Sequence, residues 1–250
     1  MKTLKDYILG TKRQLSNDNY ILTEKLKLNT KSKAIEYKYH PKDGDELTSL
    51  LEQLLKERGK DADLNDIDVS QIKTFYDGGR GKSVFEGLDP HNIDISEWDV
   101  SNAEDMHGMF YDCKNFNCDL SRWDVSNVKN MEYMFLACKN FNSDLSKWNV
   151  SNVENMECMF KGCFTFNSDL SHWDVSKVKN MSHMFTGCEK FNSDLSNWDM
   201  SNVENMYDMF AYCTKFNSDL SKWNVTKVKN MNDMFRGCTS LKNTPSWYKE

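Results

Sequence analysis

The hydrophobic residues of this chain recur every 25 positions over most of its length. One column contains only tryptophan, another only cysteine, and three more contain Met, Met and Phe without exception. The tryptophan column comprises Trp98, Trp123, Trp148, Trp173, Trp198 and Trp223, and the cysteine column comprises Cys113, Cys138, Cys163, Cys188, Cys213 and Cys238. Self-similarity at a period of roughly 20–50 residues is typical of repeat proteins, and this period falls in the solenoid range.

Each unit divides into two halves. Between Ser151 and Cys163, apolar residues have the spacing of one helical face, and Ser151 with Glu154 forms the S-x-x-E pattern of a helix-capping box. The other half, residues 141–150, alternates polar and apolar residues and predicts a short strand that stacks in parallel on its equivalents. The pattern therefore predicts an α/β repeat fold in which each coil contains a short parallel strand and a short helix.

Atypical segments flank the regular repeats. Residues 64–89 align as a degenerate first coil once a six-residue insertion, GGRGKS, is allowed for, and residues 241–250 are interpreted as a C-terminal cap. The repeat solenoid then spans residues 64–250. Residues 31–63 contain an alternating segment, AIEYKYH, and a leucine-faced helical segment, DELTSLLEQLLKERG, which predict a capping strand and helix. Residues 1–30 are expected to form an N-terminal arm or anchor.

The repeat FNxDLSxWDVSNVxNMxxMFxxC resembles that of the BspA-like leucine-rich-repeat surface proteins, specifically the mycoplasma lipoprotein-associated repeat type. The segment M-x-x-M-F-x-x-C-x-x-F is similar to the leucine-rich pattern L-x-x-L-x-L-x-x-N/C-x-L, one residue shorter. The resemblance extends from about Leu64 to Leu241. It implies a leucine-rich-repeat-like solenoid of seven coils and a bacterial or bacteriophage origin, because such repeats are common in gut bacteria and phages. The function of this repeat type is unknown.

The net charge of −6 is unevenly distributed. Residues 1–60 contain 13 Lys/Arg and 9 Asp/Glu, a balance of 13 − 9 = +4, whereas the remainder has 19 − 29 = −10. An acidic array disfavours nucleic acid as a partner. No segment approaches the roughly 20 apolar residues of a membrane span, and the N-terminus lacks the apolar region of a signal peptide. We therefore expect a cytoplasmic or virion-associated location rather than secretion, although the resembling family is often found at the cell surface.

The repeated columns have both structural and chemical interpretations. The cysteine column fits a reduced, buried ladder, since free cysteine packs as a small hydrophobe. Cys118 and Cys158 lie off this ladder and are the candidates for reactive or stray thiols. The Met, Phe and Trp columns are expected to form the core, and the alternative is an exposed tryptophan row that binds sugars or peptides.

Two charged columns suggest further roles. An unbroken aspartate column comprises Asp94, Asp119, Asp144, Asp169, Asp194 and Asp219. These carboxylates either cap backbone N–H groups in their turns or bind calcium. A second column alternates in sign, Glu104, Lys129, Glu154, Lys179, Glu204 and Lys229. We expect this alternation to favour the correct stacking register, because neighbouring coils then present opposite charges.

No catalytic constellation emerges from spacing. Nearly every chemically active residue is copied in each coil, and the five histidines share no obvious column. The sequence therefore predicts a protein that is not an enzyme, with no cofactor, no metal and no small-molecule substrate.

The remaining positions vary from coil to coil and predict a surface for a protein partner, either a host surface protein or an assembly subunit. Tyr111, Tyr133, Tyr207 and Tyr212 are the candidate anchors, because tyrosine supplies contact area at low entropic cost. The variable column before each tryptophan contributes the candidates Arg122, Lys147 and His172. The alternative is a structural scaffold or decoration subunit of a larger assembly such as a virion, anchored through residues 1–60.

Overall fold

The computed structural model describes residues 35–77 and 82–249. Its contacts divide the chain into two units, Met1–Glu36 and Tyr37–Glu250. The predicted arm, residues 1–30, lies outside the described residues. All elements named below belong to the second unit.

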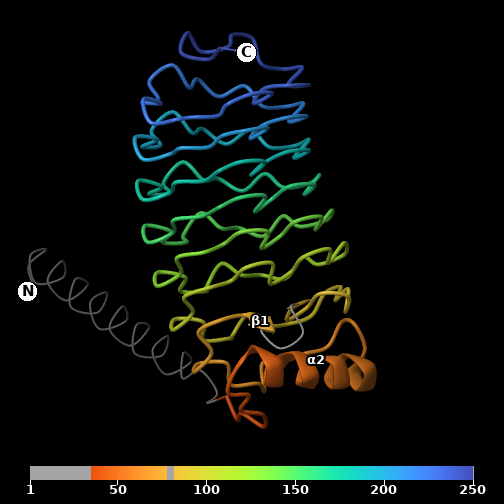
Figure 1. The fold of residues 1–250 in the computed structure, drawn as a ribbon. Coiled ribbons are helices and arrows are strands. Elements are labelled where there is room, and N and C mark those ends of the chain that lie inside the picture. The colour runs from red at the N-terminus through yellow and green to blue at the C-terminus, as the bar shows by residue number, and fades with distance from the viewer. Residues whose placement is uncertain (1–34, 78–81, 250) are drawn as a thin grey trace, which may run out of the picture. The chain divides into compact units, whose positions relative to one another are not determined.

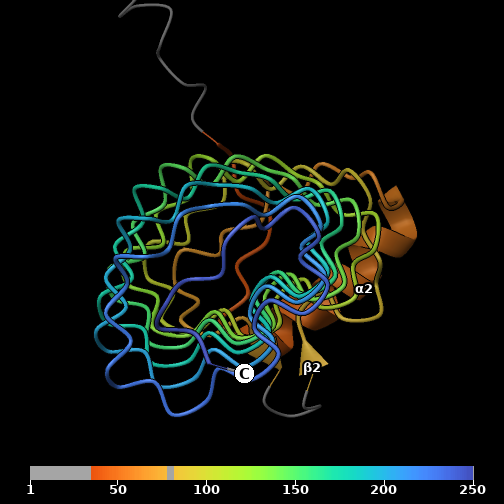
Figure 2. The ribbon, with the colours of Figure 1, turned by 90° about the horizontal axis from the view of Figure 1, so that it is seen from above.

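The second unit is a stack of coils, one above another (Figure 1), and successive coils follow nearly the same path when viewed along the stack (Figure 2). Parallel bridges join equivalent residues of adjacent coils. They connect Asp105, Asn130, Asn155, Asn180, Asn205 and Asn230 in one continuous column. Thr74 pairs with Asp105 in the same column, which confirms the six-residue insertion in the first coil. The assignment to a leucine-rich-repeat-like solenoid class stays a prediction.

The repeated apolar columns form the core. The Met and Phe columns are fully buried in the inner coils, and the tryptophans of the column are only 3–5% exposed. Each indole Nε1–H of this column donates to a backbone carbonyl in the preceding coil at 2.9–3.1 Å. Burial of these rings overturns the alternative of an exposed tryptophan row, because their faces stack on one another instead of facing solvent.

The helix α2, Gly44–Arg58, is present as predicted. The Asp43 carboxylate accepts from the Glu46 amide at 2.9 Å, and the helix ends at Gly59, whose φ of 88° suits glycine. The leucines of its inner face, Leu47, Leu51 and Leu54, are fully buried against the first coil at the end of the stack where the chain enters (Figure 1).

Residues 35–41 do not form the predicted strand. Only Tyr39 makes a bridge, in parallel with Ile67. Strands β1, Tyr76–Asp77, and β2, Lys82–Ser83, pair antiparallel instead. Strand β1 precedes the insertion and β2 contains its last two residues, while residues 78–81 lie outside the described part of the chain.

Residues 101–114 and the equivalent segments 126–139, 151–164, 176–189, 201–214 and 226–239 form a feature that we call the axial ridge. Four amides of each inner segment donate along the stack to the next coil. In one pair of coils the donors are Met156, Cys158, Phe160 and Gly162, and the acceptors are the carbonyls of Asn180, Ser182, Met184 and Thr186, at 2.8–2.9 Å. One column runs in the opposite direction, as in the bond from the Lys129 amide to the Glu104 carbonyl.

These axial bonds explain why the ridge contains turns where a helix was expected. Alternate amides are used by the next coil, so they cannot donate to the carbonyl four residues earlier. The second and fourth donors of each segment also have left-handed backbone angles, with φ between 54° and 77°. The amides between them close tight turns, such as Met159 N–H to Met156 O at 3.2 Å. A residue in the left-handed region interrupts an α-helix, so none forms in the described coils.

The start of α2 covers the carbonyl end of the axial columns. The carbonyls of Thr74 and Tyr76 are equivalent to ridge acceptors but have no preceding coil. Gly44, at the first turn of α2, lies against both, and a Cβ atom there would be 2.5 Å from the Tyr76 oxygen. A helix N-terminus carries a partial positive charge, which complements exposed carbonyl oxygens.

We expect Gly44→Ala to destabilise the protein by about 1–3 kcal/mol, because the added methyl collides with backbone that cannot give way. Urea unfolding checks this, with Asp45→Ala at the exposed neighbouring position as the control. Equal unfolding midpoints for the two variants would contradict the close approach of α2 to the carbonyls.

A second prediction concerns the left-handed positions. Ala137 and Gly162 are equivalent residues of adjacent coils, with φ of 62° and 76°. Ala137→Gly should stabilise by up to about 1 kcal/mol, and Gly162→Ala should destabilise by about 1 kcal/mol, since only glycine adopts this conformation without strain. The Cβ atom of Gly162→Ala has ordinary contact distances of 3.6 Å or more, so backbone strain alone is tested by thermal unfolding of the pair. Shifts of the same sign would refute the left-handed geometry.

Candidate interaction surface

The axial ridge carries most of the positions that vary between coils. Its conserved residues point into the core, while the residues at and beside the left-handed donors face outward or lie half-buried. Adjacent coils shield one another here, so several variable side chains are buried rather than solvent-facing. Cys158, Ser182 and Asp208 are only 3–5% exposed. The ridge surface therefore combines exposed, half-buried and buried variable side chains on one repeated backbone.

Two of the predicted tyrosines, Tyr133 and Tyr207, are half-buried on the ridge. The rings of Tyr133 and His107 meet edge to face with centroids 5.4 Å apart, and those of Tyr207 and His183 do so at 5.0 Å. Burial, with nearby Glu157, raises the pKa of Tyr133 to about 12. Part of each tyrosine ring is therefore in contact with a histidine of the protein itself and is not available to a partner.

The other two predicted tyrosines are exposed. Tyr111 is 37% and Tyr212 is 50% exposed, and the Arg236 guanidinium lies 5.3 Å from the Tyr212 ring centroid. Sequence reasoning missed a third aromatic residue, Phe164, which is 40% exposed beneath the Lys139 ammonium. The sequence could have predicted the exposure of Phe164, because every equivalent position in the regular coils is polar or charged. Aromatic rings next to cations are common anchors in protein interfaces.

The remaining candidates lie in the other half of the coil. Arg122, Lys147 and His172 are exposed in the column that precedes the tryptophans, and Arg122 pairs with Glu97 of the preceding coil. The structure does not bring these residues onto the ridge with the tyrosines. The predicted site is thus two separate surfaces.

A Cys–His–Asp row went unnoticed in the sequence. Cys158, His183 and Asp208 are 25 residues apart, so they occupy one column, that of the second left-handed donor. The histidines share no column with one another, but the conclusion that no catalytic set emerges from spacing overlooked this row. His183 Nδ1 lies 3.4 Å from the Asp208 carboxylate, and Arg236 donates to both oxygens of that carboxylate at 3.0 Å.

The chemistry of this row does not favour nucleophilic attack. Burial raises the pKa of the Cys158 thiol to about 12, so the thiol stays protonated at neutral pH. Burial, followed by the Lys161 ammonium, lowers the pKa of His183. The Asp208 carboxylate is already paired with Arg236. The row is a neutral thiol and imidazole beside a satisfied ion pair.

Of the two roles expected for Cys118 and Cys158, burial disfavours the reactive thiol for the same physical reason. They are 6% and 4% exposed, and burial raises the pKa of Cys118 to about 11. The cysteine column is a ladder of free thiols, as predicted, buried from Cys113 to Cys213 and half-buried at Cys238. From the second member onward, each thiol lies 2.9–3.0 Å from a phenylalanine carbonyl of the preceding coil.

The aspartate column caps turns. Each of its carboxylates accepts from the amide of the serine two residues later at 2.9–3.0 Å. These bonds hold the pKa of Asp119, Asp144 and Asp169 below the usual 3.8. Within residues 35–77 and 82–249, no group of three His, Cys, Asp or Glu is placed to hold a metal ion, so the calcium alternative gains no support there.

The alternating column is paired as expected. Lys129, Lys179 and Lys229 each bind the glutamate of the preceding coil, at 2.8, 2.6 and 2.5 Å. These pairs are exposed, so each adds little to stability, and opposite charges meet only when the coils stack in this register.

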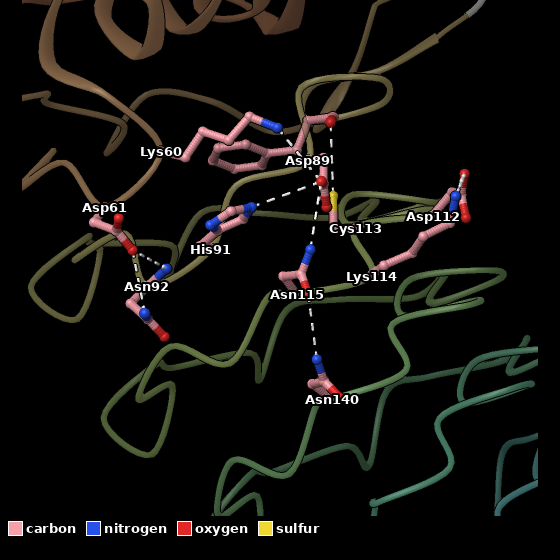
Figure 3. Close-up of polar contacts among 11 residues, drawn as sticks. Lys60, Asp61, Asp89, His91, Asn92, Asp112, Cys113, Lys114, Asn115 and Asn140 are labelled. Atoms are coloured by element: carbon pink, nitrogen blue, oxygen red, sulfur yellow. Dashed lines mark hydrogen bonds and ion pairs between the residues drawn. The ribbon is translucent and has the colours of Figure 1, made fainter.

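A polar hollow lies near the start of the array (Figure 3). It has a volume of ≈ 400 Å³ and is lined by His91, Asn92, Asn115, Asn117 and Asn140. Asp89 is the hub of the contacts beside it, with Lys60, His91 and the Asn115 amide 3.4–3.7 Å from one carboxylate oxygen. The asparagines here also bond between coils, as from the Asn140 amide to Asn115 Oδ1 at 3.3 Å. The asparagines and Asp89 Oδ2 therefore make contacts within the protein, whereas Asp89 Oδ1 is buried and has no hydrogen-bond partner among the described residues.

Stacked coils with a conserved core and a variable ridge define the chain as a repeat protein. It belongs to the family described as "Mycoplasma protein of unknown function, DUF285", whose model matches residues 49–173 and 163–249. Comparison with curated proteins finds no match, and comparison with solved structures finds none. None of the helices in the described residues has the length and apolar character needed to cross a membrane.

Because the capping aspartates have lowered pKa values, stability should fall in acid. Each contributes stability fully above the unfolded pKa near 3.8, and the contribution is lost as pH falls through the lower folded pKa. At pH 7, Asp144→Ala should cost about 1 kcal/mol through loss of the cap. Asp144→Asn should cost less, since Asn149 caps Ser151 at 3.2 Å in the same way.

Urea midpoints of both variants and the parent at pH 7 and pH 3 measure this. The parent should lose more stability between the two pH values than Asp144→Asn does. An identical loss in both would show that Asp144 does not act as an ionised cap.

Proposed function

We propose that the chain is a non-enzymatic protein-interaction module that recognises its partner with the axial ridge. One observation carries this proposal, namely that side-chain variation is concentrated on a backbone fixed in every coil by four axial hydrogen bonds. A preorganised surface loses little conformational entropy on binding, so variable side chains on it can determine specificity efficiently.

The exposed aromatic residues are the proposed anchors. Tyr111, Phe164 and Tyr212 are large, and two of them lie beside cations at 5.3 and 5.9 Å. Such residues contribute a large share of binding energy in protein interfaces. Tyr133 and Tyr207, being half-buried, are proposed to shape the surface between the anchors.

The chemistry of the Cys158 row supports a non-enzymatic role. The row provides no ionised nucleophile near neutral pH, and its carboxylate is held by Arg236. The finer kinship to BspA-like repeats, with a bacterial or phage origin and a host surface protein as partner, is part of the same proposal and rests on the repeat pattern.

The test compares two triple variants of the full chain in affinity capture from host-cell lysate and from intact cells, with quantitative mass spectrometry. The ridge variant carries Tyr111→Ala, Phe164→Ala and Tyr212→Ala. The control carries Arg122→Gln, Lys147→Gln and His172→Gln on the other exposed surface. Recovery of a partner should fall at least about tenfold for the ridge variant only, since each anchor contributes about 1–2 kcal/mol. Thermal unfolding verifies that both variants are folded.

If the control variant alone fails to recover the partner, the binding surface is the column before the tryptophans. Retention by both variants would contradict the ridge and favour a scaffold anchored through residues 1–60.

A further inference from the structure

The last ridge segment ends in a row of free donors. By equivalence with the earlier coils, the amides of Met231, Asp233, Phe235 and Gly237 point along the stack away from α2. None of the four has a hydrogen-bond partner in the described residues. Asp233 and Gly237 have φ of 57° and 73°, so the segment alternates right- and left-handed conformations. These four alternate amides form one row of unpaired donors, which attracts oxygen atoms with negative charge.

The donors at this end also lie at the positive end of the axial columns. Peptide groups bonded head to tail add their dipoles, as they do in a helix. In each inner coil, four columns of hydrogen bonds donate toward the next coil and one column donates toward the preceding coil. The reverse column ends at Lys229, whose carbonyl therefore lies beside the four free donors. The opposite, carbonyl end is covered by α2 at Gly44. A second copy therefore cannot continue the stack with its first coil, and two last coils would place donors against donors.

A hollow of ≈ 460 Å³ lies beside these donors and is lined by Asn232, Asp233, Arg236 and Tyr248. Arg236 binds the buried Asp208 at 3.0 Å and lies 3.7 Å from the exposed Asp233 carboxylate. An incoming carboxylate would replace Asp233 at the outer side of this guanidinium. Val228 and Met231, which are half-buried here while their equivalents are fully buried, add uncovered apolar surface.

The charge of successive ridge segments alternates toward this end. Residues 176–188 have a balance of 2 − 0 = +2, residues 201–213 have 0 − 2 = −2, and residues 226–238 have 3 − 1 = +2. Inside the array, the basic segment 176–188 donates its axial hydrogen bonds to the acidic segment 201–213. The last segment is basic and lacks such a neighbour among the described residues.

We propose that the exposed end of the axial ridge, residues 226–238, binds an acidic polypeptide segment of a partner protein, whose backbone carbonyls accept from the four free donors. A polypeptide fits because four donors in a row need four acceptors in a row, which a small anion does not supply. Acidity fits because the four free amides lie at the positive end of the axial columns and attract negative charge, while Lys229 and Arg236 already pair with Glu204 and Asp208 of the preceding coil. This site differs from the side of the ridge proposed above, so either can fail alone.

The test uses a peptide copied from the chain itself, residues 201–213, because this segment accepts the axial hydrogen bonds of residues 176–188 inside the array. ¹⁵N-labelled full-length protein is titrated with a synthetic peptide of residues 201–213 carrying Cys213→Ser. The comparison peptides are residues 126–138, with a balance of 1 − 1 = 0, and residues 176–188, with +2, each with its cysteine replaced by serine. We expect downfield amide proton shifts at Met231, Asp233, Phe235 and Gly237 with the acidic peptide. The equivalent amide of Gly187, already bonded to Ala211 at 2.8 Å, should not move.

Affinity should fall from the acidic to the neutral to the basic peptide. Lys227→Gln with Lys229→Gln should weaken acidic-peptide binding by about 2- to 20-fold, while Lys147→Gln on the other surface should not. Arg236 is left intact because it neutralises the buried Asp208. Equal affinity for the three peptides, or shifts confined to other amides, would overturn the proposal. Absence of any shift at millimolar acidic peptide would also overturn it.

Discussion

The whole array depends on the axial hydrogen bonds of the ridge. Each inner coil donates four amides to the next, and this fixes where the backbone must turn left-handed. Those turns decide which side chains enter the core and which remain at the surface. The buried columns of Met, Phe, Trp and Cys then fill the space that the turns enclose, and burial of so much apolar surface offsets the strain of non-glycine residues at left-handed positions.

The repeat period, the core columns, helix α2, the capping aspartates and the alternating ion pairs could all be predicted from the sequence. They depend on short-range chemistry or on strict periodicity, which a single chain displays. The turns of the ridge could not be predicted, because the spacing from Val153 to Cys163 also fits a helical face. The column of Cys158 and His183 contains one glycine, Gly108, and the other left-handed column contains Gly162, Gly187 and Gly237, a signal that the helical spacing obscured. The Cys158, His183 and Asp208 row could have been found from its 25-residue spacing, but the raised pKa of its thiol depends on burial that only the structure shows.

The division of labour between columns links the fold to the proposed role. Invariant columns carry stability, while the variable positions are held on backbone that needs no particular side chain at most of its sites. Substitutions on the ridge can therefore change recognition with little effect on stacking. The exceptions are positions such as Asp208, where a variable residue is buried and paired with Arg236 of the next coil. There, change in one coil requires change in its neighbour.

The alternating glutamate and lysine column has a consequence for how such arrays lengthen. Loss or duplication of one coil by recombination leaves the core columns in place but brings two like charges together at the junction. Loss or duplication of two coils restores opposite neighbours. Each mismatch costs little, yet selection acts on small differences near the stability threshold. Arrays of this kind should therefore evolve in steps of fifty residues, with coil pairs as the heritable unit.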